Sequence, residues 1–174
     1  ACTVGRYSDR ARRSAEGDCI ACAYGQFQGS EGATLCIDCA VGQYSSASTG
    51  VLSACVECAA GRQQDLMGSS HCDDCSRGQY AGNTGQDVCD ICALGSHQDV
   101  AGATSCDSCV PGQYSSAESS VCTDCSAGQY DDDEDPATPC VGCAPGTVSV
   151  VKQIVCAICA AGRRMSNSEP PVCT

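Results

Sequence analysis

Residues 39–58 read CAVGQYSSASTGVLSACVEC. Cys39 and Cys55 enclose a segment that contains a glycine and a tyrosine, and Cys58 follows after two more residues. Variants of this stretch run along the whole chain. Its cysteines are therefore candidates for metal ligands, for a redox centre or for structural disulfides, and the choice among these decides the fold.

The composition favours disulfides. Cysteine accounts for 20 of the 174 residues, whereas the chain has only six tyrosines, one phenylalanine and no tryptophan. Such a chain cannot fill one large apolar core, and small domains with this deficit are stabilised by disulfides or metal. Twenty bridged cysteines predict an extracellular or secretory compartment. The apolar runs are too short to insert into a membrane, and a net charge of −12 disfavours nucleic-acid binding.

A repeat of about 17 residues runs through the chain. Each repeat begins with an opening cysteine and has a first glycine three residues later and, in most repeats, an aromatic ring at the fifth residue, which we call the ring position. The glycines and rings of six repeats are Gly5 and Tyr7, Gly25 and Phe27, Gly42 and Tyr44, Gly78 and Tyr80, Gly112 and Tyr114, and Gly128 and Tyr130. Four further repeats keep the cysteine and the glycine but have Gln63, His97, Val148 or Arg164 at the ring position.

Each repeat ends with a closing cysteine, often with a second glycine four residues before it, as in Gly85 and Cys89. Two residues then lead to the next opening cysteine, so that nine C-x-x-C motifs account for all cysteines except Cys2 and Cys173. Pairing within each motif would leave those two unmatched across the chain. Bridging each opening cysteine to the next closing one leaves none over, and it predicts the disulfides Cys2–Cys19, Cys22–Cys36, Cys39–Cys55, Cys58–Cys72, Cys75–Cys89, Cys92–Cys106, Cys109–Cys122, Cys125–Cys140, Cys143–Cys156 and Cys159–Cys173.

These bridges predict a small disulfide-rich repeat fold: an elongated rod or solenoid of ten stapled loops. Frequent glycine and serine and the lack of 3.6-residue apolar periodicity predict short β-hairpins and turns with almost no helix. We expect each repeat to contact mainly its neighbours, each first glycine to supply a positive φ or a close backbone approach, and each ring to lie over the disulfide and the next repeat.

The chain is predicted to be one continuous array. Its repeats span 2–19, 22–36, 39–55, 58–72, 75–89, 92–106, 109–122, 125–140, 143–156 and 159–173. Written before Ala1 and Cys2, the last residues Cys173 and Thr174 complete another C-x-x-C motif. We therefore expect the chain to be one period of a longer array.

The unit C-x-x-G-x-Y…G-x-x-x-C-x-x-C resembles the ephrin-receptor-like cysteine-rich repeat. Its C-x-x-G-x-Y…C half is distantly similar to the first loop module of tumour necrosis factor receptor domains. The resemblance covers all ten repeats, although here Ala, Ser, Thr or Val follows the opening cysteine, where those families commonly have proline. It implies an extracellular, stapled, elongated module of the kind found in receptor ectodomains and surface proteins. No ligand-binding residue carries over.

Three other kinds of site are less well supported. A C-x-x-C pair followed by another after about 13 residues approaches zinc-ribbon spacing, but the unpaired cysteines at the ends do not fit. Nine equivalent motifs do not resemble one tuned redox thiol. His97 occupies a ring position and His71 a loop tip, without a recurring nucleophile or carboxylate partner. We therefore assign no catalytic, cofactor or metal residues and predict that the chain is not an enzyme.

The loop tips offer two weaker hypotheses. The acidic run Asp131, Asp132, Asp133, Glu134 and Asp135 is an alternative calcium site, but it lacks the alternating ligands and turning glycine of a dedicated loop, so that a solvated tip is favoured. Serines and threonines crowd the tips at 45–50 and 115–120, which makes O-linked glycans a hypothesis.

The leading functional hypothesis is a structural component of an extracellular fibre, sheath or cell-surface appendage. A stapled rod of this kind would assemble by self-association, both head to tail and laterally. The alternative is a receptor or adhesin ectodomain that binds a protein ligand. No tip concentrates the exposed aromatic and arginine residues typical of binding hot spots, and the tip around Arg10, Arg12 and Arg13 comes closest.

Overall fold

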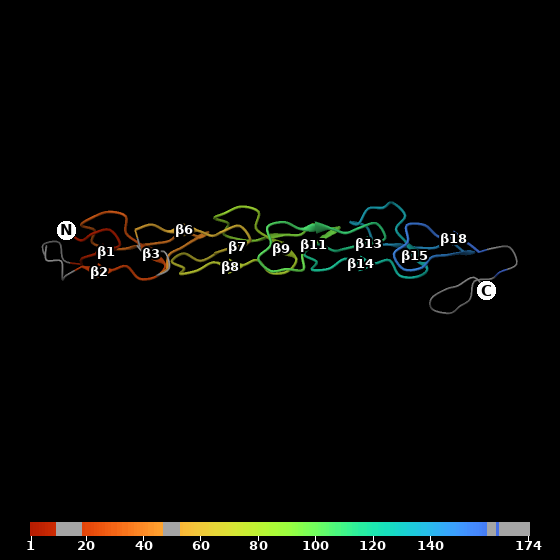
Figure 1. The fold of residues 1–174 in the computed structure, drawn as a ribbon, viewed down its shortest axis with the longest axis horizontal. Helices are drawn as coiled ribbons and strands as arrows, with labels where there is room; N and C mark the ends of the chain where they lie inside the picture. The colour runs from red at the N-terminus through yellow and green to blue at the C-terminus, as the bar shows by residue number, and fades with distance from the viewer. Residues whose placement is uncertain (10–18, 47–52, 160–162, 164–174) are drawn as a thin grey trace. The chain divides into compact units, whose positions relative to one another are not determined.

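The computed structural model describes residues 1–9, 19–46, 53–159 and 163. These residues form loops and two-residue strands and contain no helix (Figure 1). Within them, accordingly, no helical segment has the length and apolar character needed to cross a bilayer.

The strands pair into nine two-stranded antiparallel hairpins. They are β1 (Arg6–Tyr7) with β2 (Ile20–Ala21), β3 (Gln26–Phe27) with β4 (Ile37–Asp38), β5 (Gln43–Tyr44) with β6 (Val56–Glu57), β7 (Arg62–Gln63) with β8 (Asp73–Asp74), β9 (Gln79–Tyr80) with β10 (Asp90–Ile91), β11 (Ser96–His97) with β12 (Asp107–Ser108), β13 (Gln113–Tyr114) with β14 (Thr123–Asp124), β15 (Gln129–Tyr130) with β16 (Val141–Gly142), and β17 (Thr147–Val148) with β18 (Ala157–Ile158).

Each hairpin uses the same positions of the repeat. Its first strand follows the first glycine and includes the ring position, and its second strand consists of the two residues inside the next C-x-x-C motif. In β5 and β6, for example, Gln43 lies opposite Glu57 and Tyr44 opposite Val56. The second strand lies between the closing cysteine of its own repeat and the opening cysteine of the next. The disulfide of the repeat therefore holds the two strands of each hairpin close together.

The described contacts divide the chain into two compact units. The first comprises 1–75, 80–90 and 101–104, and the second comprises 76–79, 91–100 and 105–174. The first contains the four hairpins from β1 to β8, and the second contains the four from β11 to β18. The residues of β9 and β10 are divided between the two units.

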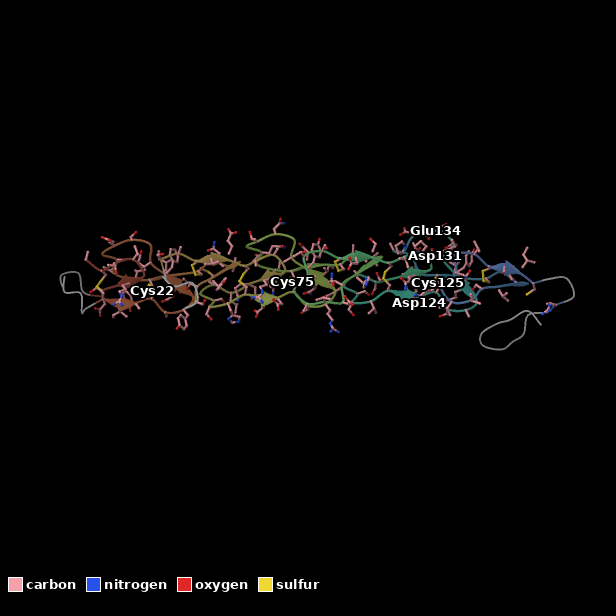
Figure 2. All side chains as sticks on the ribbon, viewed as in Figure 1. Cys22, Cys75, Asp124, Cys125, Asp131 and Glu134 are labelled. Atoms are coloured by element: carbon pink, nitrogen blue, oxygen red, sulfur yellow. A yellow bond between two sulfur atoms is a disulfide. The ribbon has the colours of Figure 1, made fainter. Side chains whose placement is uncertain are left out.

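Neither unit has a large apolar core. In the first seven repeats the buried positions instead recur: the opening cysteine, the first glycine and the residue six places after the opening cysteine, which we call the sixth position. Cys22, Cys75 and Cys125, labelled in Figure 2, are at most 5% exposed. Most larger side chains point outward from the ribbon (Figure 2). The prediction of a small disulfide-rich repeat fold is confirmed.

Candidate functional site

Nine disulfides join the described cysteines, and each joins an opening cysteine to the next closing one. They are Cys2–Cys19, Cys22–Cys36, Cys39–Cys55, Cys58–Cys72, Cys75–Cys89, Cys92–Cys106, Cys109–Cys122, Cys125–Cys140 and Cys143–Cys156. These are nine of the ten predicted pairs. The tenth, Cys159–Cys173, involves Cys173, which lies outside the described residues. In every motif whose cysteines are both described, the two therefore belong to different repeats.

The backbone of each first glycine connects its repeat to the next one. Its N–H donates to the carbonyl oxygen of the following repeat's sixth position, as from Gly42 to Gln64 at 2.7 Å. Its own carbonyl accepts from the next opening cysteine, as from the Cys58 N–H at 2.8 Å. The second glycine adds a bond in the reverse direction, as from the Gly85 N–H to the Cys58 carbonyl at 2.8 Å. Because these contacts use main-chain atoms, they recur throughout both units in spite of the variable tips.

The first glycine also contacts the repeat two places further along. A Cβ on Gly61, whose φ is +86°, would overlap the carbonyl oxygen of Gly102. Gly25, Gly42, Gly78 and Gly112 face the carbonyls of Gly68, Gly85, Glu118 and Lys152 in the same way. The positive φ and the close backbone approach, predicted as alternatives, are thus both present at these glycines, whereas the prediction of contacts mainly between immediate neighbours did not include these contacts to the second neighbour.

Two of the described repeats place a charged residue at the second-glycine position. Glu118 and Lys152 have φ values of 60° and 64°, in the left-handed region that favours glycine. Their side chains reach polar partners: Glu118 accepts from Gln79 Nε2 at 2.7 Å, and Lys152 Nζ lies 3.2 Å from Asp124 Oδ1. These polar contacts accompany the unfavourable backbone conformation.

The sixth position alternates along the chain. In the odd-numbered repeats it is a small residue, and in the even-numbered repeats up to the eighth it is glutamine or aspartate, whereas the tenth repeat has Met165; the first nine are Ser8, Gln28, Ser45, Gln64, Ala81, Gln98, Ser115, Asp131 and Ser149. The side chain of each of the three glutamines forms hydrogen bonds within the loop tip of its own repeat. Gln64 Nε2, for example, donates to the His71 carbonyl oxygen, and Gln64 Oε1 accepts from the Leu66 N–H. Three of the serines instead donate to the preceding repeat, as Ser45 Oγ does to the Gln26 carbonyl at 2.9 Å.

This alternation makes the structural period a pair of repeats. Sequence reasoning missed it, although the signal is visible as serine or alanine alternating with a longer polar residue one place after the ring. Ser45 and Ser115, which begin two of the serine-rich tips, are 0% and 3% exposed. Their hydroxyls are therefore not accessible glycan acceptors, and residues 47–50 of the first tip lie outside the described residues.

The ring positions are half-buried, which places them between the hairpin and the solvent. This holds for Tyr7, Phe27, Tyr44, Tyr80, Tyr114 and Tyr130. The polar substitutes reach the closing cysteine of the following repeat: Gln63 Oε1 accepts from the Cys89 N–H at 2.9 Å, and His97 Nδ1 lies 3.2 Å from Cys122 Sγ. His97 therefore contacts the disulfide of the next repeat.

The acidic tip does not converge on a single point. Asp131 is 5% exposed, and its Oδ2 accepts from the Gly112 N–H at 2.9 Å, where other repeats use a main-chain carbonyl. Glu134, labelled with it in Figure 2, is exposed. Asp133 accepts from the Asp135 N–H and from the Thr138 hydroxyl, and these hydrogen bonds lower the pKa of its carboxyl. The acidic run therefore has two parts. The carboxylate of Asp131 points inward and hydrogen-bonds to the preceding repeat, whereas Asp133 and Asp135 belong to an exposed loop with hydrogen bonds within itself.

His71 differs from His97 in its surroundings. Its ring contacts Ser70 Oγ at 3.3 Å and lies 3.5 Å from Asp73 Oδ1, and its side chain is exposed. It does not approach the disulfide of its neighbour Cys72 in any described contact.

No protein-family model and no curated protein matches the sequence.

Proposed function

We propose that the chain is a structural component of an extracellular fibre, sheath or cell-surface appendage, in which disulfide-stapled repeats form a rod that self-associates head to tail and laterally. No catalytic role is part of this proposal. Chains with this density of disulfides belong to oxidising compartments. The observation that carries the proposal is the recurrence of one main-chain contact from repeat to repeat within each unit.

Such a contact is general rather than specific. It requires only a glycine, an opening cysteine and an acceptor at the sixth position, so that the same contact forms between successive repeats of either kind. In repeat proteins of this kind, stability grows by adding repeats and neighbour contacts, without a central site. This logic favours a self-complementary structural protein over one that binds a single ligand.

Exposed apolar side chains support the lateral part of the proposal. The residue immediately before the closing cysteine is a large apolar residue, and exposed, in four described repeats: Leu35, Val88, Val121 and Val155. Because these side chains recur at one position of the repeat, a contact formed at one would be formed again further along the array. Exposed apolar surface is a common feature of association sites.

Sedimentation of the full chain over a range of concentrations tests self-association. The expected result is association that increases with concentration. Replacing the four residues together, as Leu35→Ser, Val88→Ser, Val121→Ser and Val155→Ser, should weaken it about tenfold or more, because their apolar area would no longer be buried. The matched control, Leu35→Val with Val88→Leu, Val121→Leu and Val155→Leu, keeps the positions apolar and should associate like the parent chain.

A chain that stays monomeric at every concentration would contradict the proposal and favour the receptor or adhesin alternative. Equal association of the serine and control variants would exclude these four residues from the lateral contact while leaving head-to-tail association in place.

A further inference from the structure

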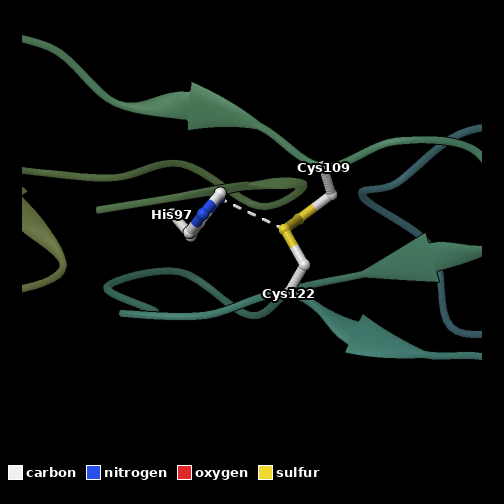
Figure 3. Close-up of side chains that lie close together, drawn as sticks. All are labelled: His97, Cys109 and Cys122. Carbon is white, nitrogen blue, oxygen red and sulfur yellow. Dashed lines mark hydrogen bonds between the residues drawn. A yellow bond between two sulfur atoms is a disulfide. The ribbon is translucent and has the colours of Figure 1, made fainter. Parts of the chain in front are cut away.

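His97 lies directly beside the disulfide of the following repeat. Its Nδ1 is 3.2 Å from Cys122 Sγ, and the donor atoms of His97, Cys109 and Cys122 all lie within 4.8 Å of one another (Figure 3). His97 and Cys122 are half-buried, and Cys109 is 7% exposed. An imidazole and two sulfurs, the groups that thiophilic metals prefer, are thus already gathered at one point.

The imidazole is oriented by its neighbours. Besides Cys122 Sγ, Nδ1 approaches the Asp107 carbonyl oxygen at 3.2 Å. Both neighbours are acceptors only, because a carbonyl and a disulfide sulfur carry no hydrogen, so Nδ1 must carry the proton in the oxidised protein. Because His97 Nδ1 carries a proton and the two sulfurs are bonded to each other, these three atoms cannot coordinate a metal while the disulfide is intact.

We propose that His97, Cys109 and Cys122 form a latent site for a thiophilic metal ion such as Zn²⁺, which opens when the Cys109–Cys122 disulfide is reduced. This site is separate from self-association and does not depend on it.

The chemistry balances with an external monothiol as reductant. Two monothiol molecules are oxidised to their disulfide, the Cys109–Cys122 bond accepts the two electrons, and each cysteine sulfur gains a proton. Metal binding then displaces both thiol protons, and the Nδ1 proton of His97 moves to Nε2 through solvent, so that the Nδ1 lone pair becomes a ligand. The three protein ligands leave a fourth position for water.

The distances suit one ion. Zinc bonds sulfur at about 2.3 Å and nitrogen at about 2.0–2.1 Å, so two ligands of one ion lie within about 4.6 Å of each other. The three donor atoms are within 4.8 Å before any movement, and the freed sulfurs need only to separate by side-chain rotation. The half-buried His97 and Cys122 provide access from solvent.

The other ring positions do not offer this combination. In the other eight described repeats the residue is tyrosine, phenylalanine, glutamine or valine. Gln63 is the closest parallel, because its side chain also reaches the closing cysteine of the next repeat, Cys89. It lacks the imidazole nitrogen, so its site would supply two thiolates alone.

The test equilibrates the full chain in a monothiol redox buffer with and without Zn²⁺ and measures the reduced fraction of each cysteine pair by differential alkylation and peptide mapping. Zinc at about ten times the dissociation constant of the site should shift the reduction equilibrium of Cys109–Cys122 about tenfold relative to the other pairs, because the ion binds only the reduced state. His97→Tyr, which installs a residue common at ring positions, should abolish the shift.

Two variants provide the controls. Gln63→His should create a second zinc-dependent shift, at Cys75–Cys89. His71→Gln, which changes the histidine that lies away from any described disulfide, should leave the shift at Cys109–Cys122 unchanged. A zinc effect spread evenly over all pairs, or one that survives His97→Tyr, overturns the proposal, and so does the absence of any shift at Cys75–Cys89 in Gln63→His.

Discussion

At the scale of the residue, the first glycine is the position that tolerates least change. It combines a positive φ, a hydrogen bond in each direction to the next repeat, and close approach to a carbonyl of the second repeat along. Gly61 illustrates all three, with φ at +86°, an N–H bond to the Ala81 carbonyl, and the Gly102 carbonyl where a Cβ would lie. No other residue satisfies both the conformation and the space.

Replacing Gly61 by alanine should therefore destabilise the first unit. The left-handed conformation costs about 1–2 kcal/mol and the overlap about 1–3 kcal/mol more, for a total of about 2–5 kcal/mol. Denaturant unfolding with the disulfides intact measures the change. Gly142→Ala is the matched control, because its Cβ would meet nothing within 4 Å, and it should change stability by less than about 1 kcal/mol. Equal effects of the two substitutions would contradict this account of the contact.

A second prediction concerns Asp124. Its pKa is lowered, first by the hydrogen bond from Gln113 Nε2 at 2.6 Å and then by Lys152. A lowered pKa in the folded state means that the carboxylate stabilises the protein above the ordinary aspartate pKa of about 3.9, and that this contribution is lost as the pH falls further.

NMR titration of the Asp124 carboxyl tests the order of these causes. Gln113→Leu should raise its pKa toward the ordinary value, and Lys152→Met should raise it by a smaller amount. A pKa that does not respond to Gln113→Leu, or that responds more to Lys152→Met, would show that the hydrogen bond is not the main cause.

At the scale of the element, the structure is built from pairs of repeats. Odd and even repeats fill the sixth position differently, with serine reaching back to the preceding repeat and glutamine bracing its own tip. The first glycines of the second to seventh repeats lie against the repeat two places on. The contacts of an odd-numbered repeat are therefore suited to an even-numbered neighbour, and those of an even-numbered repeat to an odd-numbered one.

Deletions that respect or break this alternation should differ. Removing 39–74, a pair of repeats, leaves an even repeat followed by an odd one, and the remaining chain should unfold with nearly unchanged cooperativity and midpoint. Removing 58–74 alone places two odd repeats side by side and loses Gln64, and it should lower the thermal midpoint although fewer residues are lost. If the shorter deletion is the better tolerated, a pair is not the structural unit.

The sequence predicts the local elements well for a physical reason. The cysteine pattern restricts pairing, and nine bridges and their hairpins follow from it. The sequence allowed a close backbone approach at the first glycine, but it did not identify the repeat two places along as the partner, because spacing along the chain does not say which carbonyl lies against the glycine. The inward turn of Asp131 was likewise hidden, since its position within an acidic run predicts a solvated side chain, whereas its carboxylate replaces the main-chain acceptor for Gly112.

At the scale of the whole molecule, we propose that the repeats serve as a structural scaffold that self-associates. Each bridge closes a loop of 13–17 residues in sequence and contributes roughly 3 kcal/mol, so that stability comes from many similar local terms. A chain stabilised in this way needs no particular length. Its recurrent exposed apolar side chains and main-chain contacts would allow one copy of the chain to bind another. That is the behaviour expected of a building block.

The most direct test is electron microscopy of the native material, isolated without reduction. The account predicts filaments with a regular axial modulation at the spacing of repeat pairs. Monodisperse particles that never associate, at any concentration at which the native material is found, would contradict it.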